Sequence, residues 1–150
     1  MTVIEGLRSY LLANAEIAAI VGTRAFPLRL PQKVDLTAHK GAIVLTRVDD
    51  IRDAHLRGPN ALSRARIQVD CWAQTFDDTT ALGTLCRQRL NGYSGTWTDN
   101  AMSPPTLVRV QAILMDTESD FAEPDIQGGF YRHSTDYMVS YVSVDEAILI

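Results

Sequence analysis

Residues 64–73 are Arg-Ala-Arg-Ile-Gln-Val-Asp-Cys-Trp-Ala, and small or apolar side chains alternate with larger polar ones along them. Alternation with a period of two indicates a β-strand with one buried face. Residues 42–48 are apolar and β-branched, which predicts a second strand just upstream. The segment between them, 49–63, contains Gly58-Pro59-Asn60, so we expect an exposed connection. The two strands then form an antiparallel hairpin with an extended tip.

Upstream of the hairpin, the sequence predicts two short helices. Thr2 and Glu5 have the spacing of a capping box at the start of the first helix. Asn14 is a suitable N-cap for the second, which Gly22 ends. The apolar positions at helical spacing are Ile4, Leu7, Leu11, Ile17, Ile20 and Val21. Residues 23–40 contain two prolines and predict an irregular segment.

Downstream of the hairpin, the sequence predicts one helix and two strands. Asp77 or Asp78 can cap the helix, and Gly92 ends it. Its apolar stripe consists of Ala81, Leu82, Leu85, Cys86 and Leu90. The two strands are residues 106–115 and 130–144. In the first of these strands, the side chains expected on one face are Val108, Val110, Ala112 and Leu114.

The order of these elements favours an α+β fold. Hairpins bracket a helix and there is no alternation of strand and helix, so we expect an antiparallel four-stranded sheet with helices packed on one face. A chain of 150 residues has the usual length of one domain. We therefore expect a single domain over residues 1–150, with an apolar C-terminal tail at 144–150.

Composition excludes several classes of protein. The N-terminal apolar residues are interrupted by Glu5, Arg8 and Glu16, so no signal-peptide core is expected. No stretch approaches the roughly 18 apolar residues of a membrane span, and no membrane partner is expected. Cys71 and Cys86 are too few for a disulfide scaffold. Assembly in a reducing cytoplasm is the matching expectation.

Charge is distributed unevenly along the chain. Residues 1–90 hold 12 of the 14 Lys and Arg residues against 9 acids, a balance of +3, whereas residues 91–150 hold 2 against 9, a balance of −7. This pattern argues against one broad basic footprint for nucleic acid. Two oppositely charged poles suit head-to-tail association of subunits, and chance segregation on a solvated surface is the alternative.

The local signatures of catalytic and cofactor sites are missing. Gly92-Tyr93-Ser94-Gly95 is one residue too short for a nucleophile elbow, and Lys33 and Lys40 do not lie in a phosphate-binding loop. The three histidines, His39, His55 and His133, are scattered, and Cys71 and Cys86 lack the short spacing of a zinc site. Both cysteines fall on apolar faces and are expected in the core. No metal or cofactor is predicted.

An acidic, turn-rich loop is predicted at residues 116–129. Its acids are Asp116, Glu118, Asp120, Glu123 and Asp125, with no base between them and without the spacing of an EF-hand. Trp72 and Trp97 are expected at the edge of the core or at a subunit interface, because stacking platforms for nucleic acid require a positive groove.

Several phrases occur in an order that resembles the tail-completion, or tail-terminator, proteins of tailed bacteriophages. A capped N-terminal helix precedes Phe26-Pro27-Leu28-Arg29-Leu30-Pro31-Gln32, and Gly58-Pro59 precedes the strand at 63–73. Leu90-Asn91-Gly92-Tyr93-Ser94-Gly95 follows at a helix end, and the chain continues with Gly129-Phe130-Tyr131-Arg132 and the rest of the last strand. The resemblance covers residues 25–142. Residues 33–40 and the tail after Val144 depart from it.

The resemblance implies a structural virion protein at the tail-neck junction. Such a protein forms a ring, usually hexameric, on the last ring of tail tube protein, ends tube growth, and offers a surface to the head-side connector or stopper protein. DNA passes through the lumen of the ring without sequence-specific binding. No catalytic residue, metal or cofactor is implied.

Three groups of residues are candidates for assembly contacts. The tip of the hairpin, with Arg52, His55 and Arg57, is long and carries mixed charge, so we expect it to contact a neighbouring subunit or the tail tube. Ile148, Leu149 and Ile150 are an apolar segment expected at an interface, with packing on the chain's own sheet as the alternative. The acidic residues from Asp116 to Asp125 are expected on the lumen or on one ring face.

Two other functions remain open from the sequence. One is another neck protein, either a head-completion stopper or a connector adaptor. The second is a small enzyme whose site is assembled from distant residues, for example His133, Asp136 and an arginine. Side chains three residues apart on a strand point to opposite faces, which argues against that site.

Overall fold

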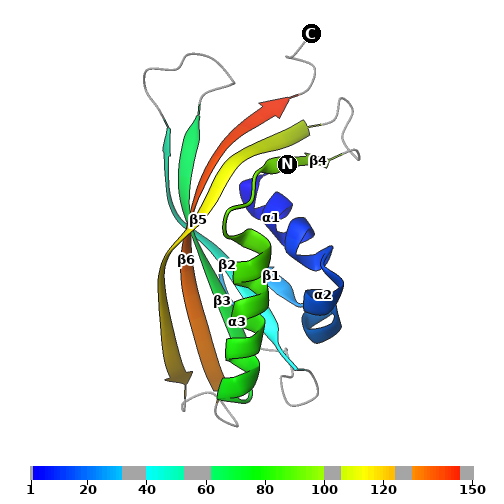
Figure 1. The fold of residues 1–150 in the computed structure, drawn as a ribbon, viewed down its shortest axis with the longest axis vertical. Helices are drawn as coiled ribbons and strands as arrows, with labels where there is room; N and C mark the ends of the chain where they lie inside the picture. Colours follow the sequence, from blue (N-terminus) through cyan, green and yellow to red (C-terminus); the bar gives the residue numbers. More distant parts are fainter. Residues whose placement is uncertain (1, 32–39, 53–61, 100–105, 124–129, 146–150) are drawn as a thin grey trace.

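The structure is a computed structural model that describes residues 2–31, 40–52, 62–99, 106–123 and 130–145. Helices and strands alternate irregularly along the chain (Figure 1). The elements are α1 (Val3–Leu12), α2 (Ala15–Val21), β1 (Ala25–Pro27), β2 (Ala42–Arg52), β3 (Ser63–Ala73), α3 (Phe76–Leu90), β4 (Gly95–Asp99), β5 (Thr106–Glu123) and β6 (Phe130–Asp145).

One mixed sheet of six strands, in the order β1-β2-β3-β6-β5-β4, curls into a half-barrel. The four expected strands, β2, β3, β6 and β5, lie side by side and are antiparallel, as predicted. The expected count of four strands is wrong, because a short strand is added at each edge. β1 pairs parallel to β2, and β4 pairs antiparallel to β5.

The two added strands were missed for different reasons. β1 has three residues and ends at Pro27, and the edge of the sheet tolerates a proline that a central strand would exclude. No element was predicted for β4, although Thr96, Trp97 and Thr98 are strong strand formers. Segment 23–40 is therefore not irregular throughout.

Helix termini follow the capping chemistry of the sequence. The capping box of Thr2 and Glu5 is formed at the start of α1, and the Asn14 side chain accepts the backbone N–H groups of Glu16 and Ile17. Gly92, with a φ of +83°, follows the C-cap Asn91 and ends α3 as expected, but the expected N-cap is wrong. Thr75 is its N-cap, and Asp77 and Asp78 lie in the first turn, where their charges favour the helix dipole.

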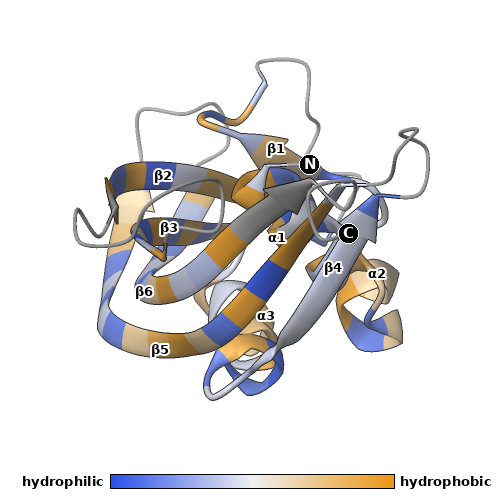
Figure 2. Ribbon diagram, turned by 90° about the horizontal axis from the view of Figure 1, so that it is seen from above, coloured by the Kyte–Doolittle hydropathy of each residue, from blue (hydrophilic) through white to orange (hydrophobic). Residues whose placement is uncertain are grey.

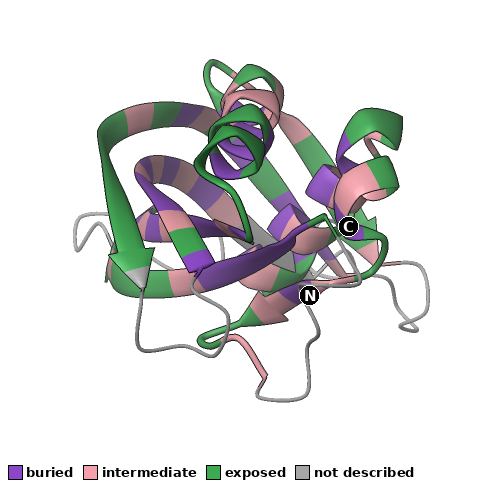
Figure 3. Ribbon diagram, turned by 90° about the horizontal axis from the view of Figure 1, so that it is seen from below, coloured by how far each residue is buried: buried purple, intermediate pink, exposed green. Residues whose placement is uncertain are grey.

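The core lies between the sheet and the three helices, which all pack on one face, as predicted. Apolar residues alternate with polar ones along β5 and β6 (Figure 2). The buried residues of α3 lie on the side toward the sheet (Figure 3). The inward side chains of β3, from Ala65 to Ala73, are all buried, and the Sγ atoms of Cys71 and Cys86 lie 4.0 Å apart. Both cysteines are core residues, as expected.

β5 departs from strict alternation because it contains two bulges, one between Val110 and Ala112 and the other between Met115 and Thr117. A bulge adds one residue and reverses which side chains face inward. After the first bulge, Ile113 is fully buried and Leu114 is 58% exposed. The prediction that Leu114 shares a face with Val108 is therefore wrong.

Candidate functional site

The hairpin of β2 and β3 has a shorter tip than the sequence predicted. β2 continues to Arg52 and β3 begins at Ser63, so residues 49–52, expected in the connection, belong to a strand. These residues pair with residues 63–66 of β3, but Asp49 and Asp50 are adjacent acids and Ile51 is exposed, so no alternating pattern marks them as a strand. Arg52 is the last residue of β2, and His55 and Arg57 lie outside the described residues.

The base of the hairpin is tied to β6. The hydroxyl of Tyr141 donates a hydrogen bond to Asp50, and Arg47 Nη1 lies 3.5 Å from Asp50 Oδ2. Burial, and then the hydrogen bond to Asp50, raises the pKa of Tyr141 to about 12. This cluster links β2 to β6 below the tip of the hairpin.

The hairpin and the C-terminal segment leave from the same end of the sheet. Ser63 pairs with Tyr141, and β6 continues past that point to Asp145 (Figure 1). Ile148, Leu149 and Ile150 lie outside the described residues. Glu123 and Phe130 lie at the opposite end. The hairpin proposed for an assembly contact therefore leaves the sheet at one end of the subunit, and the acidic segment of β5 ends at the opposite end.

The acidic segment is not a loop up to Glu123. Residues 116–123 are the second half of β5, and their side chains alternate between the two faces of the sheet. The polar composition suggested a loop, but Thr117, Ser119 and Phe121 keep the period of a strand. Asp125 and the side chain of Glu123 lie outside what the structure describes.

On the helix side of β5, the acids contact basic groups. Asp120 Oδ1 lies 2.6 Å from His133 Nδ1, and Glu118 Oε2 lies 3.5 Å from His133 Nε2. Glu118 also lies 3.6 Å from Arg87 Nη1 of α3. Gly83 of α3 faces His133, and a Cβ atom there would overlap the imidazole. The cluster joins α3, β5 and β6.

On the outer face, Arg66 of β3 lies between two acids. Its Nη1 is 2.6 Å from Asp116 Oδ2 and 3.4 Å from Asp136 Oδ2. The side chain of Arg132 lies over the rings of Phe121 and Trp72, with its Cζ atom 4.3 Å and 5.6 Å from the ring centroids. The segment has no base along its own sequence, but the fold supplies bases from neighbouring elements.

No catalytic constellation stands out among the described residues. His133 faces α3, whereas Asp136 contacts Arg66 on the outer face, so the expected separation of these side chains is confirmed. Within the described ranges, no three His, Cys, Asp or Glu side chains converge as metal ligands. Trp97 is buried beside Gly6 and Tyr93, and Trp72 lies half-buried on the outer face.

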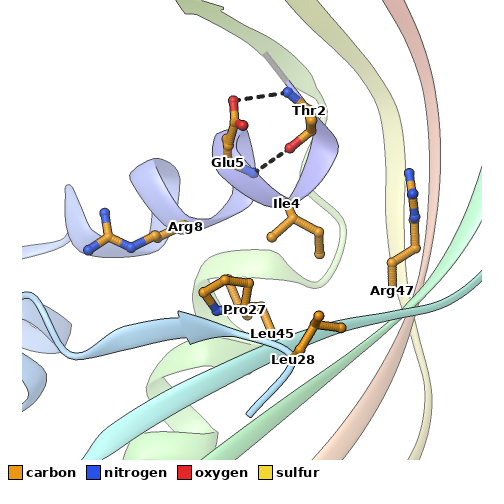
Figure 4. Close-up of a pocket in the computed structure, with 8 residues that line it drawn as sticks. All are labelled: Thr2, Ile4, Glu5, Arg8, Pro27, Leu28, Leu45 and Arg47. Carbon is orange, nitrogen blue, oxygen red and sulfur yellow. Dashed lines mark hydrogen bonds between the residues drawn. The ribbon is translucent and has the colours of Figure 1, made fainter. Parts of the chain in front are cut away.

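A groove that the sequence did not reveal lies between the first turn of α1 and the edge of the sheet. Its volume is about 370 Å³, and Figure 4 shows the residues that line it. Its lining residues are Thr2, Ile4, Glu5, Arg8, Pro27, Leu28, Leu45 and Arg47. Leu28 is 73% exposed and has a φ of +70°, a conformation that is strained by roughly 1–2 kcal/mol for a residue other than glycine. Nothing in the composition of residues 26–32 signals this strain.

In the described part of the chain, no helix is long and apolar enough to cross a membrane.

Residues 5–141 match the family model described as tail completion protein gp17. The chain belongs to this family. The match begins within α1, covers α2, α3 and five complete strands, and ends within β6. The resemblance noted from the sequence is therefore confirmed and extends into α1. No curated protein sequence matches the chain.

A solved structure agrees in fold. A chain from the virion of a native gene transfer agent particle superposes with a TM-score of 0.67 over 93% of this chain and 94% of its own length, at 14% sequence identity. At this identity the likeness concerns the fold. Tail completion proteins are structural proteins of phage tails and not an enzyme class, so the chain is a tail structural protein.

Proposed function

We propose that this protein closes the head-proximal end of a phage or phage-like tail tube as a ring, ends tube growth, and provides the surface that joins the tail to the head connector. The match of residues 5–141 to the tail completion family carries this proposal. The ring is a homo-oligomer, with six subunits as the expected number. Its place is the tail-neck junction of the virion, and it assembles in the host cytoplasm.

The chemical difference between the two poles of the subunit supports a ring with two distinct faces. Toward one end of the sheet lie Asp50 and Arg52, and the segment with Ile148 to Ile150 follows β6 from that end. At the other end lie Asp120 and Glu123. A ring built from heterologous contacts needs different surfaces on each subunit, and one face then meets the tube while the other meets the connector.

We assign the hairpin tip, with Arg52, His55 and Arg57, to a contact with the adjacent subunit or the terminal tube ring. Mixed charge suits complementary pairing with a protein surface. Ile148, Leu149 and Ile150 are assigned to a second contact, because a run of large apolar side chains is an association surface when it is left in water.

The acids of β5 are proposed to face the lumen or one ring face, where repulsion of phosphate lets DNA pass without adhering. Asp116 and Glu118 form ion pairs with Arg66 and Arg87, so these two acids contribute less to the negative potential that would repel DNA. Glu123→Lys with Asp125→Lys should therefore create salt-sensitive DNA binding by the assembled ring, and Glu123→Gln with Asp125→Asn is the charge-neutral control. Unchanged DNA affinity at low salt would remove these acids from the passage.

Cryo-electron microscopy of the purified protein tests the ring. Ring-shaped class averages are expected, and compact monomers at assembly concentrations would contradict the proposal. The alternative, a head-completion stopper or connector adaptor, is distinguished by the partner. A tail-terminator ring binds purified tail tubes, whereas a stopper or adaptor binds the portal side and leaves tubes uncapped.

A further inference from the structure

The groove beside α1 has an apolar floor and one charged side chain at its rim. Ile4, Pro27, Leu28 and Leu45 supply the floor (Figure 4). Three of its polar lining residues use their polar atoms within the chain. Thr2 and Glu5 bond to each other in the capping box, and Arg8 donates to the carbonyl oxygens of Ala25 and Thr23. Arg47 pairs with Asp50 at 3.5 Å, but its side chain is half exposed, so its guanidinium can also meet an incoming group.

A tight turn held by two backbone hydrogen bonds keeps the side chain of Leu28 exposed. The N–H of Arg29 donates to the carbonyl oxygen of Pro27 at 2.8 Å, which closes a three-residue turn around Leu28. The N–H of Leu28 donates to Leu45 of β2 at 3.0 Å. A γ-turn with positive φ is rare for a residue that carries a side chain. Strain of this kind is a reason to look for a function, because glycine would satisfy the turn alone.

In the described part of the chain, the sheet edge beside the groove has no paired strand past Leu28. The pairing of β1 with β2 ends at Pro27 and Leu45. Among the described residues, no strand takes the place of β1 beyond that point. An open edge offers backbone hydrogen bonds to an added strand, and the apolar floor offers space for alternate side chains of that strand.

The sequence of this chain contains a segment with the matching chemistry. Residues 146–150 are Glu-Ala-Ile-Leu-Ile, in which one acid precedes an apolar run. The apolar side chains suit the groove floor, and the carboxylate of Glu146 complements the half-exposed Arg47 at the rim.

We propose that the groove beside α1 receives residues 147–150 of a second copy of this chain. The inference rests on the proposed ring, since a ring closed by heterologous contacts needs a donor surface and an acceptor surface on every subunit. The segment is the donor and the groove is the acceptor. Leu28 and the other floor residues contact the apolar side chains of the bound segment, and Arg47 pairs with the acid that precedes it.

Cross-linking tests which chain fills the groove. The full chain carrying Leu28→Cys and Leu149→Cys should form a ladder of disulfide-linked oligomers on a non-reducing denaturing gel. The native thiols of Cys71 and Cys86 are buried and do not compete. The matched control carries Leu114→Cys and Leu149→Cys, because Leu114 is an exposed leucine on the outer sheet face. The control should give no ladder. A cross-link confined to the monomer, or none in an assembled sample, would overturn the proposal.

The variant Leu28→Gly distinguishes an effect on subunit assembly from an effect on monomer folding. Glycine accepts the positive φ, and the lost side chain is mostly exposed, so the urea midpoint of the monomer should stay the same or rise. Subunit association should weaken by about tenfold or more, as expected for the loss of an apolar anchor. Unchanged association of Leu28→Gly, with assembly of the wild type, would overturn the groove proposal alone. A wild type that stays monomeric would overturn the ring and the groove together.

Discussion

Leu82 of α3 is the residue through which the packing of helix on sheet is best measured. Its side chain is fully buried, whereas Leu85, on the same stripe, is half-buried. Leu82→Ala should therefore lower the free energy of unfolding by about 2–5 kcal/mol in urea melts. Leu85→Ala should lower it by clearly less, because its removal leaves a smaller cavity. Equal losses for the two variants would contradict this account of the α3 interface.

Tyr141 leads to a prediction of how the stability of the protein depends on pH. Its pKa in the folded protein is raised to about 12, above the ordinary value of 10.0. The neutral phenol is therefore favoured by folding, and its contribution to stability is complete below pH 10 and is lost as the pH rises toward 12. Urea unfolding should show a smaller alkaline loss of stability in Tyr141→Phe than in the wild type. Identical losses in both proteins would contradict the raised pKa of Tyr141, and with it the burial of its hydroxyl group and the hydrogen bond to Asp50.

Single residues that act locally were predictable, and those that act through the fold were not. Thr2, Glu5 and Asn14 were identified as caps because a cap uses groups within three residues. The partners of Asp116 and Glu118 are Arg66 and Arg87, far away in sequence. No local pattern predicts such pairs. The positive φ of Leu28 was missed for the same reason, since a hydrogen bond to Leu45 of β2 helps to hold it.

At the scale of helices and strands, the contact between α3 and β6 depends on a glycine, Gly83, which has no side chain. A Cβ atom at Gly83 would overlap the His133 ring, which is held by Asp120 and Glu118. Alanine favours a helix over glycine by about 1 kcal/mol. Overpacking of a core contact typically costs about 1–3 kcal/mol. We therefore expect Gly83→Ala to destabilise the protein despite its better helix propensity.

The double variant supplies the control for this contact. In a His133→Ala background the overlap is gone, so Gly83→Ala should become stabilising through helix propensity. Urea melts of the four proteins in a double-mutant cycle measure the coupling between the two positions. Stabilisation by Gly83→Ala in the wild-type background would mean that α3 lies farther from β6 than the structure indicates.

Helices and strands were predicted correctly where a single physical cause, such as burial of one face, set the sequence pattern. β3 was found because burial of one face imposes a period of two from Ala65 to Ala73. β5 was found but ended too early, because its second half packs fewer apolar residues and carries acids. Its bulges also defeat any strict period, since each extra residue exchanges the two faces. β1 and β4 are short edge strands whose existence depends on a neighbour.

At the scale of the whole molecule, we expect substitutions in the hairpin tip to weaken assembly without changing the fold. Arg52→Glu with Arg57→Glu should weaken capping of purified tail tubes while circular dichroism stays unchanged. The control is Arg64→Glu with Arg109→Glu, which makes the same charge change at two exposed positions within strands. Wild-type affinity of the tip variant for tubes in low salt would place the tip away from the interface.

The family could be predicted from the order of local phrases, and the match over residues 5–141 confirms it. The assembly surfaces are harder to predict because they are defined by which elements lie together. That the hairpin and the end of β6 leave from one pole follows from the pairing of Ser63 with Tyr141. The groove beside α1 likewise combines α1, β1 and β2 with the turn at Leu28, and no single segment announces it.

The central claim is that this protein ends the growth of a tail tube. Its direct test is to add the purified protein to tail tube protein that is polymerising in vitro, and to measure tube length and the occupancy of tube ends by electron microscopy. The account predicts tubes whose length falls as the protein concentration rises, each with a ring at one end only. Tubes of unchanged length with bare ends, at concentrations where the protein itself forms rings, would contradict it.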